Sequence, residues 1–127
     1  MNRPQHDRPM AKEYLERLEA LLRPVGRTLP PEIEFAIKHF FSGAAAYANG
    51  RLCITLTTVG LALKLPEDSR ARLKKKGAKP LRYFPNGPIK KGYMVVPRSY
   101  REDRRKLAAW ARKSIDHVLT LPKPKRR

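Results

Sequence analysis

The chain has 127 residues, a length that fits one folded domain and is too short for two ordinary ones. Its 29 Lys and Arg against 11 Asp and Glu give a net charge of +18, which predicts attraction to phosphates, acidic proteins or anionic membrane surfaces. The single cysteine, Cys53, excludes an intramolecular disulfide, and no apolar run suits a signal peptide or a membrane span, so we expect a cytoplasmic protein in a reducing compartment.

The first predicted element is an amphipathic helix that follows a tail, residues 1–10, expected to be disordered. Leucines recur at three- and four-residue steps from Lys12 to Leu22, and Pro24 with Gly26 is expected to end the helix. Residues 30–41 are ambiguous, because two prolines at the start suit a helix whereas the alternating apolar residues after them suit a strand. Periodicity leaves both possibilities open for this segment.

Three strands are predicted next, and the first two form a hairpin. Asn49-Gly50 is the favoured pair for a two-residue type I′ turn, because both positions need a positive φ. This turn gives the hairpin an expected core face made of Ala45, Tyr47, Leu52, Ile54 and Leu56. The other face is expected to be small or polar, with Ala44, Ala46, Ala48, Arg51, Cys53 and Thr55. A third strand, Val59 to Leu65, alternates large apolar residues with smaller ones and a lysine.

A short helix follows these strands. Pro66, Glu67 and Asp68 open it with an acidic first turn that suits the helix dipole. Three lysines, residues 74–76, fill its last turn, and Gly77 is expected to supply the C-cap.

A second hairpin and a closing helix complete the predicted elements. Leu81 to Phe84 and Tyr93 to Val96 are strand-like runs on either side of a Pro85-Asn86-Gly87-Pro88 turn. Ser99 is expected to cap the final helix, which ends at Leu121-Pro122. The apolar stripe of this helix consists of Leu107, Trp110, Ala111, Ser114, Ile115 and Val118. Residues 120–127 are expected to form a basic, disordered tail.

The order of these elements predicts the fold class. A helix, three strands, a helix, two strands and a helix, with hairpins joining the strands, favour an α+β domain over a doubly wound parallel sheet. We expect a single domain over residues 11–119, with an antiparallel sheet of about five strands and the helices packed on one face.

Several short motifs also occur in an order that is typical of a known family. They are Phe40-Phe41-Ser42-Gly43, Asn49-Gly50, Leu61-Ala62-Leu63-Lys64, Gly77, Tyr83-Phe84, Tyr93 to Pro97, and Leu107 with Trp110-Ala111. In this order and spacing the chain resembles the N-terminal domain of the TfoX/Sxy family over roughly residues 33–119. Ser42 stands where that family usually has glycine.

The resemblance implies an antiparallel α+β domain of a class that often pairs into dimers. The named members are regulators of DNA uptake competence that act on transcription with a partner activator, and the longer members carry a second, C-terminal domain. The resemblance brings no catalytic residues to this chain.

Candidate residues for catalysis or metal binding are few. His6, His39 and His117 lie far apart in sequence, and a cysteine in a strand, as Cys53 is, usually acts as a small hydrophobe. One cysteine and three scattered histidines offer no metal-ligand spacing. The run Ser42 to Ala46 has neither the spacing of a phosphate-binding loop nor a helix start after it. We therefore expect no enzymatic activity, no metal and no cofactor.

The basic residues carry the main functional signal, because they are unevenly placed. Residues 1–69 hold 9 Lys and Arg with 8 Asp and Glu, whereas residues 70–127 hold 20 and 3. On a helical wheel, Arg101, Arg105 and Arg112 fall within about 40° of one another, away from the apolar stripe of the final helix. The candidate nucleic-acid-binding residues are Lys74, Lys75, Lys76, Lys79, Arg82, Arg101, Arg104, Arg105 and Arg112.

Two functions are compatible with this pattern. The first is a non-enzymatic binding or regulatory module that holds DNA or RNA through its phosphates. Four aromatic residues would be available to stack on bases if exposed, namely Tyr83, Phe84, Tyr93 and Tyr100. The alternative is a protein-interaction module, a small homodimer that binds an acidic protein and has no nucleic-acid role.

Overall fold

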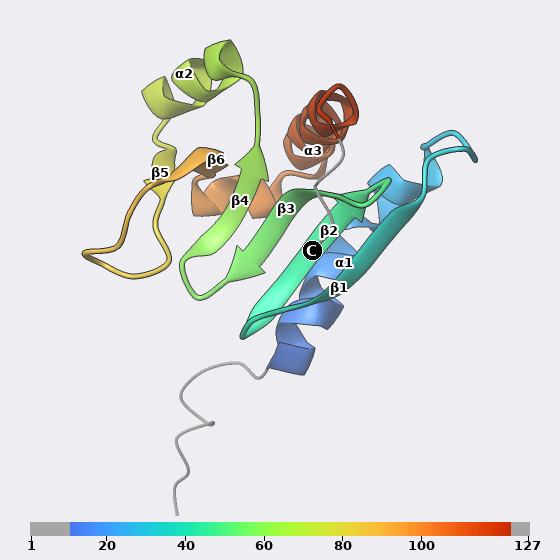
Figure 1. Cartoon of the computed structure of the whole chain (residues 1–127), viewed down its shortest axis with the longest axis horizontal. Helices are drawn as coiled ribbons and strands as arrows, with labels where there is room; N and C mark the ends of the chain where they lie inside the picture. Colours follow the sequence, from blue (N-terminus) through green and yellow to red (C-terminus); the bar gives the residue numbers. More distant parts are fainter. Residues whose placement is uncertain (1–10, 123–127) are drawn as a thin grey trace, which may run out of the picture.

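The structure is a computed structural model that describes residues 11–122 (Figure 1). Its helices are α1 (Ala11–Arg27), α2 (Glu67–Lys75), the 3-10 helix η2 (Arg98–Glu102) and α3 (Arg104–Leu119). Its strands are β1 (Phe35–Phe40), β2 (Gly43–Ala48), β3 (Arg51–Thr57), β4 (Gly60–Lys64), β5 (Lys79–Leu81) and β6 (Lys90–Val95). They form one antiparallel sheet in the order β1-β2-β3-β4-β6-β5. The predicted fold class is confirmed, with six strands where about five were expected.

The α-helices pack on one face of this sheet and bury the main core between themselves and the strands. Helix α1 covers β1 and β2, α3 lies beside α1 over β3 and β4, and α2 packs against β6 (Figure 1). Leu18 and Leu22 of α1 meet Ile54, Leu63 and Ile115 in this core, all of them fully buried. Among the helices that the structure describes, none is long and apolar enough to cross a membrane. The predicted tail at residues 1–10, and residues 123–127 of the predicted tail at 120–127, lie outside the described residues.

Helix α1 continues through Pro24 and ends at Arg27, one residue after Gly26, so the expectation that Pro24 helps to end the helix is wrong. A proline inside a helix costs about 3 kcal/mol because it lacks an N–H donor. Here Leu22 and Val25, on either side of the proline, are buried in the core, and this packing holds the last turn in place. The Thr28 hydroxyl then donates to the Val25 carbonyl at 2.8 Å.

Residues 35–40 form a strand, which decides the ambiguous segment. Strand β1 pairs with β2 from Phe35 opposite Ala48 to Phe40 opposite Gly43. Phe35 and Ile37 pack against the main core. The alternation of apolar residues therefore indicated the correct structure. Pro30 and Pro31 precede the strand and do not open a helix.

A β-bulge at Cys53 changes which residues of the first hairpin face the core. The Asn49-Gly50 turn has the expected positive φ values, 51° and 78°, and it sets the predicted pair of Tyr47 with Leu52. The next pair is Ala46 with Ile54, so Cys53 has no residue opposite it. The helix-facing residues are Ala44, Ala46, Ala48, Cys53, Ile54 and Leu56. The opposite face carries Ala45, Tyr47, Leu52 and Thr55.

The prediction that Ile54 and Leu56 face the core is confirmed, but the rest of the predicted core face, Ala45, Tyr47 and Leu52, lies on the opposite side of the sheet. The bulge is the reason, because the extra residue puts Leu52 and Ile54 on different faces. Helix α3 stabilises the bulge. The Ser114 hydroxyl donates to the Cys53 carbonyl at 2.9 Å, in a buried position. This bond ties the irregular part of the ladder to α3.

Helix α2 ends as predicted. Gly77 has a φ of 105°, and its N–H donates to the Lys74 carbonyl at 3.1 Å. The N–H of Ala78 donates to the Leu73 carbonyl at 3.0 Å, which completes a Schellman motif. Ala78 and Leu73 are both buried, so the cap also makes the hydrophobic contact that usually accompanies this motif.

The second hairpin is confirmed, with different strand bounds: β5 ends at Leu81, where the predicted strand began, and β6 begins at Lys90, before the predicted start at Tyr93. Strands β5 and β6 pair, but Tyr83 and Phe84 lie in the loop between them, not in a strand.

The start of the final helix differs from the prediction. Arg98–Glu102 forms the separate η2, and Asp103 caps α3 by accepting a hydrogen bond from the Lys106 N–H at 3.1 Å. The cap predicted at Ser99 is therefore wrong, and Arg101 does not lie on α3. The predicted apolar stripe is confirmed, except that Trp110 is only half-buried.

Candidate functional site

The face of the sheet that the helices leave uncovered has its own small cluster of buried residues, Ala62, Leu81 and Tyr93. Phe40, at the end of β1, lies against Tyr83 in the β5–β6 loop, with 6.3 Å between ring centroids. Strands β1 and β5 are the two edges of the sheet. The β5–β6 loop therefore reaches across this face from one edge of the sheet to the end of β1.

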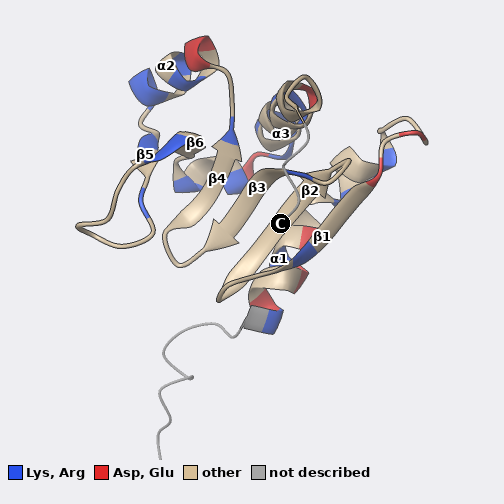
Figure 2. Cartoon of the chain, viewed as in Figure 1, with Lys and Arg blue, Asp and Glu red and all other residues tan. Residues whose placement is uncertain are grey.

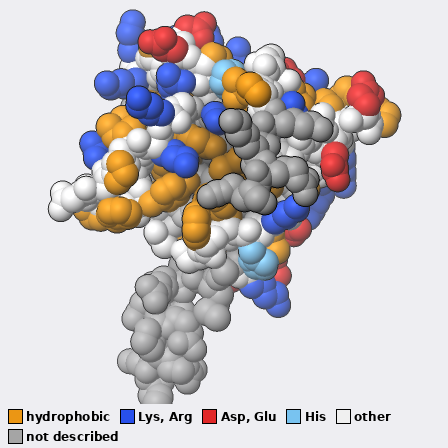
Figure 3. Space-filling model, viewed as in Figure 1, with side chains coloured by type: hydrophobic (Ala, Val, Ile, Leu, Met, Phe, Trp, Pro, Cys, Tyr) orange, Lys and Arg blue, Asp and Glu red, His pale blue; other side chains and the backbone are white. Residues whose placement is uncertain are grey.

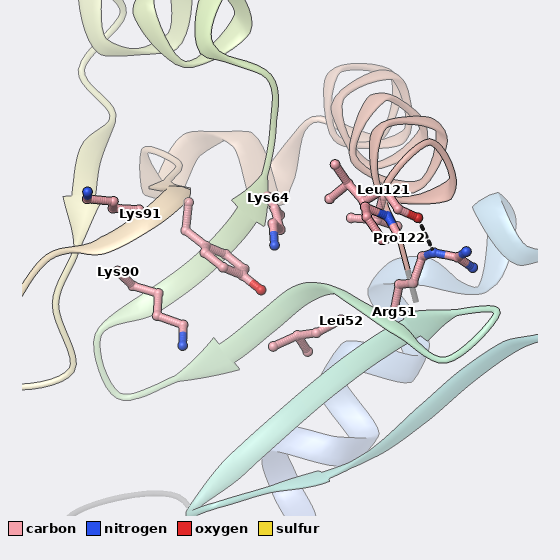
Figure 4. Close-up of a pocket in the computed structure, with 9 residues that line it drawn as sticks. Arg51, Leu52, Lys64, Lys90, Lys91, Leu121 and Pro122 are labelled. Carbon is pink, nitrogen blue, oxygen red and sulfur yellow. Dashed lines mark hydrogen bonds between the residues drawn. The ribbon is translucent and has the colours of Figure 1, made fainter. Parts of the chain in front are cut away.

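A cleft of about 440 Å³ opens at one end of this face, where β3 begins and β4 ends (Figure 4). Strands β3 and β4 pair only between Ile54–Leu63 and Thr57–Gly60, because the bulge bends β3 away before Ile54. Strand β4 continues beside β6, with Lys64 opposite Tyr93. The described residues that line this basic cleft are Arg51, Leu52, Lys64, Lys90, Lys91, Tyr93, Val118, Leu121 and Pro122.

Four of these lining residues are basic, and none of the described ones is acidic. Arg51 is held in place, because its Nε donates to the Leu121 carbonyl at 2.8 Å and its Nη1 donates to the Asn49 carbonyl at 3.3 Å. The Nζ of Lys64 lies 5.6 Å from the centroid of the Tyr93 ring, within the range of a cation–π contact. Figure 4 shows Lys64 and Lys90 pointing toward the space beside Leu52, whereas the Arg51 guanidinium lies next to Leu121. The cleft is therefore a concentrated and partly preorganised positive site.

Neighbouring titratable groups respond to this environment. Burial, followed by the nearby charges of Lys64 and Arg70, lowers the pKa of His117 in the last turn of α3. Burial raises the pKa of the Tyr93 hydroxyl, so this residue stays an uncharged phenol at neutral pH. Both groups are therefore uncharged at neutral pH, so the charge of the basic cleft comes from its Lys and Arg residues.

A second hollow, of about 370 Å³, lies between α2 and β6 and adjoins the basic cleft. Lys90, Lys91 and Tyr93 line both, while Arg70 and Lys74 add positive charge on the far side and Glu67 is the acidic residue there. Figure 2 shows Lys and Arg around α2, β5 and β6, and several Asp and Glu on α1 behind the sheet. The positive surface thus continues beyond the cleft toward α2.

Charge along the sequence predicted a set of nucleic-acid-binding residues, but the structure does not bring them together on one surface. Lys74 lines the second hollow, and the Arg82 Nη1 donates to the Gly87 carbonyl at 2.6 Å. The remaining predicted residues of α2, β5 and the first turn of α3 are exposed and line none of the hollows described above: Lys75, Lys76, Lys79 and Arg105.

The other three predicted arginines lie on the helix side of the molecule. Arg101 and Arg104 line a third hollow, between α1 and α3, which is otherwise mostly apolar. Burial, followed by the charge of Arg98, lowers the pKa of Arg101. Arg112 forms an exposed ion pair with Asp116, with 3.1 Å between Nε and Oδ1.

Sequence reasoning passed over all four cleft cations as site residues. Arg51 and Lys64 belong to the nearly neutral half of the chain, so counting charge along the sequence gives them no weight. Lys90 and Lys91 contribute to the charge of the second half, but no local motif marks them. Only the sheet order, which places β6 beside β4, brings the four together.

Cys53 is buried, and its Sγ donates to the Ala46 carbonyl at 3.3 Å. Burial raises the pKa of this thiol to about 12, so the reactive thiolate is disfavoured in the folded protein. In the part of the chain that the structure describes, no three His, Cys, Asp or Glu side chains gather as a metal ion would require.

The sequence pattern of the TfoX N-terminal domain matches residues 31–118, a span that contains all six strands and α2 and nearly all of α3. No curated protein matches the chain. The match extends from the residues before β1 to the α3 residues that close the basic cleft. Because it covers most of the sequence, the chain belongs to the TfoX N-terminal domain family.

Proposed function

We propose that this protein is a non-enzymatic binding or regulatory module that holds nucleic acid through phosphates at the basic cleft. Its family favours a regulatory or binding role. The nucleic-acid part rests on one observation: Arg51, Lys64, Lys90 and Lys91, from three strands, line a cleft whose described lining has no carboxylate.

The physical argument is that like charges held together repel one another, and an anion bound between them relieves this repulsion. Arg51 is already fixed by two backbone carbonyls, so binding loses little of its side-chain freedom. A polyanion suits the surface better than a single phosphate, because Lys90 and Lys91 also face the second hollow, where Arg70 and Lys74 extend the positive charge.

The non-enzymatic part of the proposal is supported by the state of the best nucleophile. Cys53 is buried among core side chains, and its raised pKa keeps it protonated at neutral pH. It does not line the basic cleft.

The test is the salt dependence of binding by the full chain, measured by fluorescence anisotropy with labelled single-stranded and duplex oligonucleotides. Four phosphate contacts predict that affinity falls about 50-fold for a single strand and about 150-fold for a duplex between 50 and 200 mM salt. Little base preference is expected, since phosphates carry no sequence information. An absence of binding at low salt, or binding that salt does not weaken, would overturn the proposal.

The competing function is a homodimer that binds an acidic protein, and an exposed apolar residue, Phe41, favours it. A pull-down from lysate with and without nuclease separates the two functions. Under our proposal, captured material is lost after nuclease treatment. A defined acidic protein that still binds the purified chain in the absence of nucleic acid would support the competing function.

A further inference from the structure

Exposed aromatic side chains are the second unusual feature of this surface. Phe41 is 87% exposed and Phe84 is 58% exposed, although large apolar side chains are normally buried. Of the four aromatics that the sequence offered for base stacking, Tyr93 and Tyr100 are buried and Tyr83 is half-buried, so Phe84 is the one with a largely free ring. Figure 3 shows hydrophobic side chains over the β5–β6 side of the uncovered face, with Lys and Arg near them.

An aromatic row is defined here as Phe41, Phe40, Tyr83 and Phe84, of which the first three are linked by ring contacts. Phe41 and Phe40 make an edge-to-face contact with 4.7 Å between centroids, and Phe40 contacts Tyr83. Phe84 packs over Gly87, where a Cβ atom would lie only 2.7 Å from the Phe84 ring. The row therefore joins the β1–β2 turn to the β5–β6 loop.

Phe41 also has an uncommon backbone conformation. Its φ of 51° lies in the left-handed region, which bulky residues rarely adopt. Neither the turn nor burial of the ring accounts for a phenylalanine at this position, since glycine or asparagine would suit the turn better. Such a residue is a candidate for a contact with a ligand.

The aromatic row and the basic cleft lie on the same face, at opposite ends of β3. Arg51 is at the cleft, and Leu56, five residues further along, pairs with Ala44 close to the β1–β2 turn. Five residues of strand span about 17 Å. Tyr83 packs on the same buried cluster as the cleft residue Leu52, so the surface between the two ends is continuous.

We propose that the nucleic acid bound at this face is single-stranded, with its phosphates at the basic cleft and its bases stacked on Phe41 and Phe84. This inference rests on the proposed function and names the form of its ligand. Single strands present unpaired base faces to aromatic side chains, whereas a duplex keeps those faces stacked inside. A cationic groove beside exposed rings is the arrangement that sequence-tolerant single-strand binders use.

Charge argues against the other occupant of an exposed apolar face, a second copy of this chain. Each copy carries a net charge of +18 and would bring its own cleft cations toward those of its partner. A polyanion removes this repulsion, whereas a homodimer through the same face increases it.

The experiment compares Phe41→Ala and Phe84→Ala with an Asn86→Ala control in the full chain. Asn86 is exposed on the same β5–β6 loop, lies outside the aromatic row and lines none of the three hollows. A labelled single-stranded oligonucleotide and the duplex of the same sequence serve as probes. We expect each phenylalanine variant to bind the single strand about tenfold more weakly, the usual effect of losing one stacked ring. Duplex binding and the control variant should change little.

Three results would overturn the inference. The first is salt-dependent binding that does not prefer the single strand and does not respond to either phenylalanine, which leaves the proposed function standing. The second is a drop in sedimentation mass for Phe41→Ala in the absence of nucleic acid, which assigns the face to a second copy. The third is no binding of either probe at low salt, which removes the proposed function as well. Melting temperatures of the variants verify folding.

Discussion

Replacing Lys90 and Lys91 with glutamine tests whether the basic cleft holds phosphates. Both lysines are exposed at the start of β6 and line the cleft and the adjoining hollow, so their loss should not disturb the core. Two of the four cleft cations disappear in the Lys90→Gln, Lys91→Gln variant. The slope of log K against log salt should then fall by about 1.4 on a single strand. Raising salt from 50 to 200 mM would weaken binding about 7-fold, compared with about 50-fold for the unmodified chain.

A matched control is Lys75→Gln with Lys76→Gln. These two lysines are also exposed and line neither the basic cleft nor the second hollow. Their substitution removes the same charge from the same half of the chain as the cleft variant does. The assay is anisotropy with one labelled single strand over a series of salt concentrations. We expect the control to change the slope less than half as much as the cleft variant. An equal change in both would refute the reasoning, because binding would then depend on net charge and not on the cleft.

Further predictions concern the scaffold and the chain end. Gly43→Ala places a Cβ 2.3 Å from the Leu56 carbonyl oxygen, so we expect a loss of about 1–3 kcal/mol in the free energy of unfolding; unchanged urea denaturation would contradict this close packing. Ser114→Ala leaves the buried Cys53 carbonyl without its donor and should cost about 1–3 kcal/mol, whereas Ala109→Ser at an exposed position of α3 should cost far less. Cys53, with a pKa of about 12, should resist iodoacetamide at pH 8 in the folded protein and react after unfolding in urea. Rapid labelling of the native protein would contradict the burial of this thiol. Because the pKa of Cys53 is higher in the folded protein than the value of about 9 for an exposed thiol, the free energy of unfolding should also fall as pH rises above about 9. Deleting residues 123–127 removes four positive charges next to Pro122, which lines the cleft, and should lower the salt slope without lowering the melting temperature; an unaltered slope would exclude the chain end from binding.

The parts of the fold that depend on local chemistry could be predicted from the sequence. Asn49-Gly50 fixes its turn because both residues tolerate a positive φ, and Gly77 ends α2 for the same reason. The apolar stripe of α3 follows from helical spacing alone. These features need only neighbouring residues.

The features that went unpredicted depend on contacts between distant segments. The bulge at Cys53 is stabilised by Ser114, which lies 61 residues later in the chain. Pro24 stays inside α1 because Leu22 and Val25 are buried in the core. The tendency of proline to end a helix takes no account of such tertiary packing.

The same limit applies to the candidate site. A count of charges along the chain found the basic second half, but the cleft forms where β3 and β4 separate, a position that the bulge determines. Arg51 and Lys64 become site residues only because β6 lies beside β4 and brings Lys90 and Lys91 to them. Tertiary structure therefore selects the four cleft residues from the many basic ones.

The most direct measurement of the central claim is an amide NMR titration of the full chain with a short single-stranded oligonucleotide. We expect the largest shift changes at Arg51, Lys64 and Lys90 around the basic cleft, and at Phe41 in the aromatic row. The exposed side of α1, on the opposite face of the sheet, should remain unchanged. Largest changes at Arg101 and Arg104, in the hollow between α1 and α3, would contradict the assignment of binding to the uncovered face.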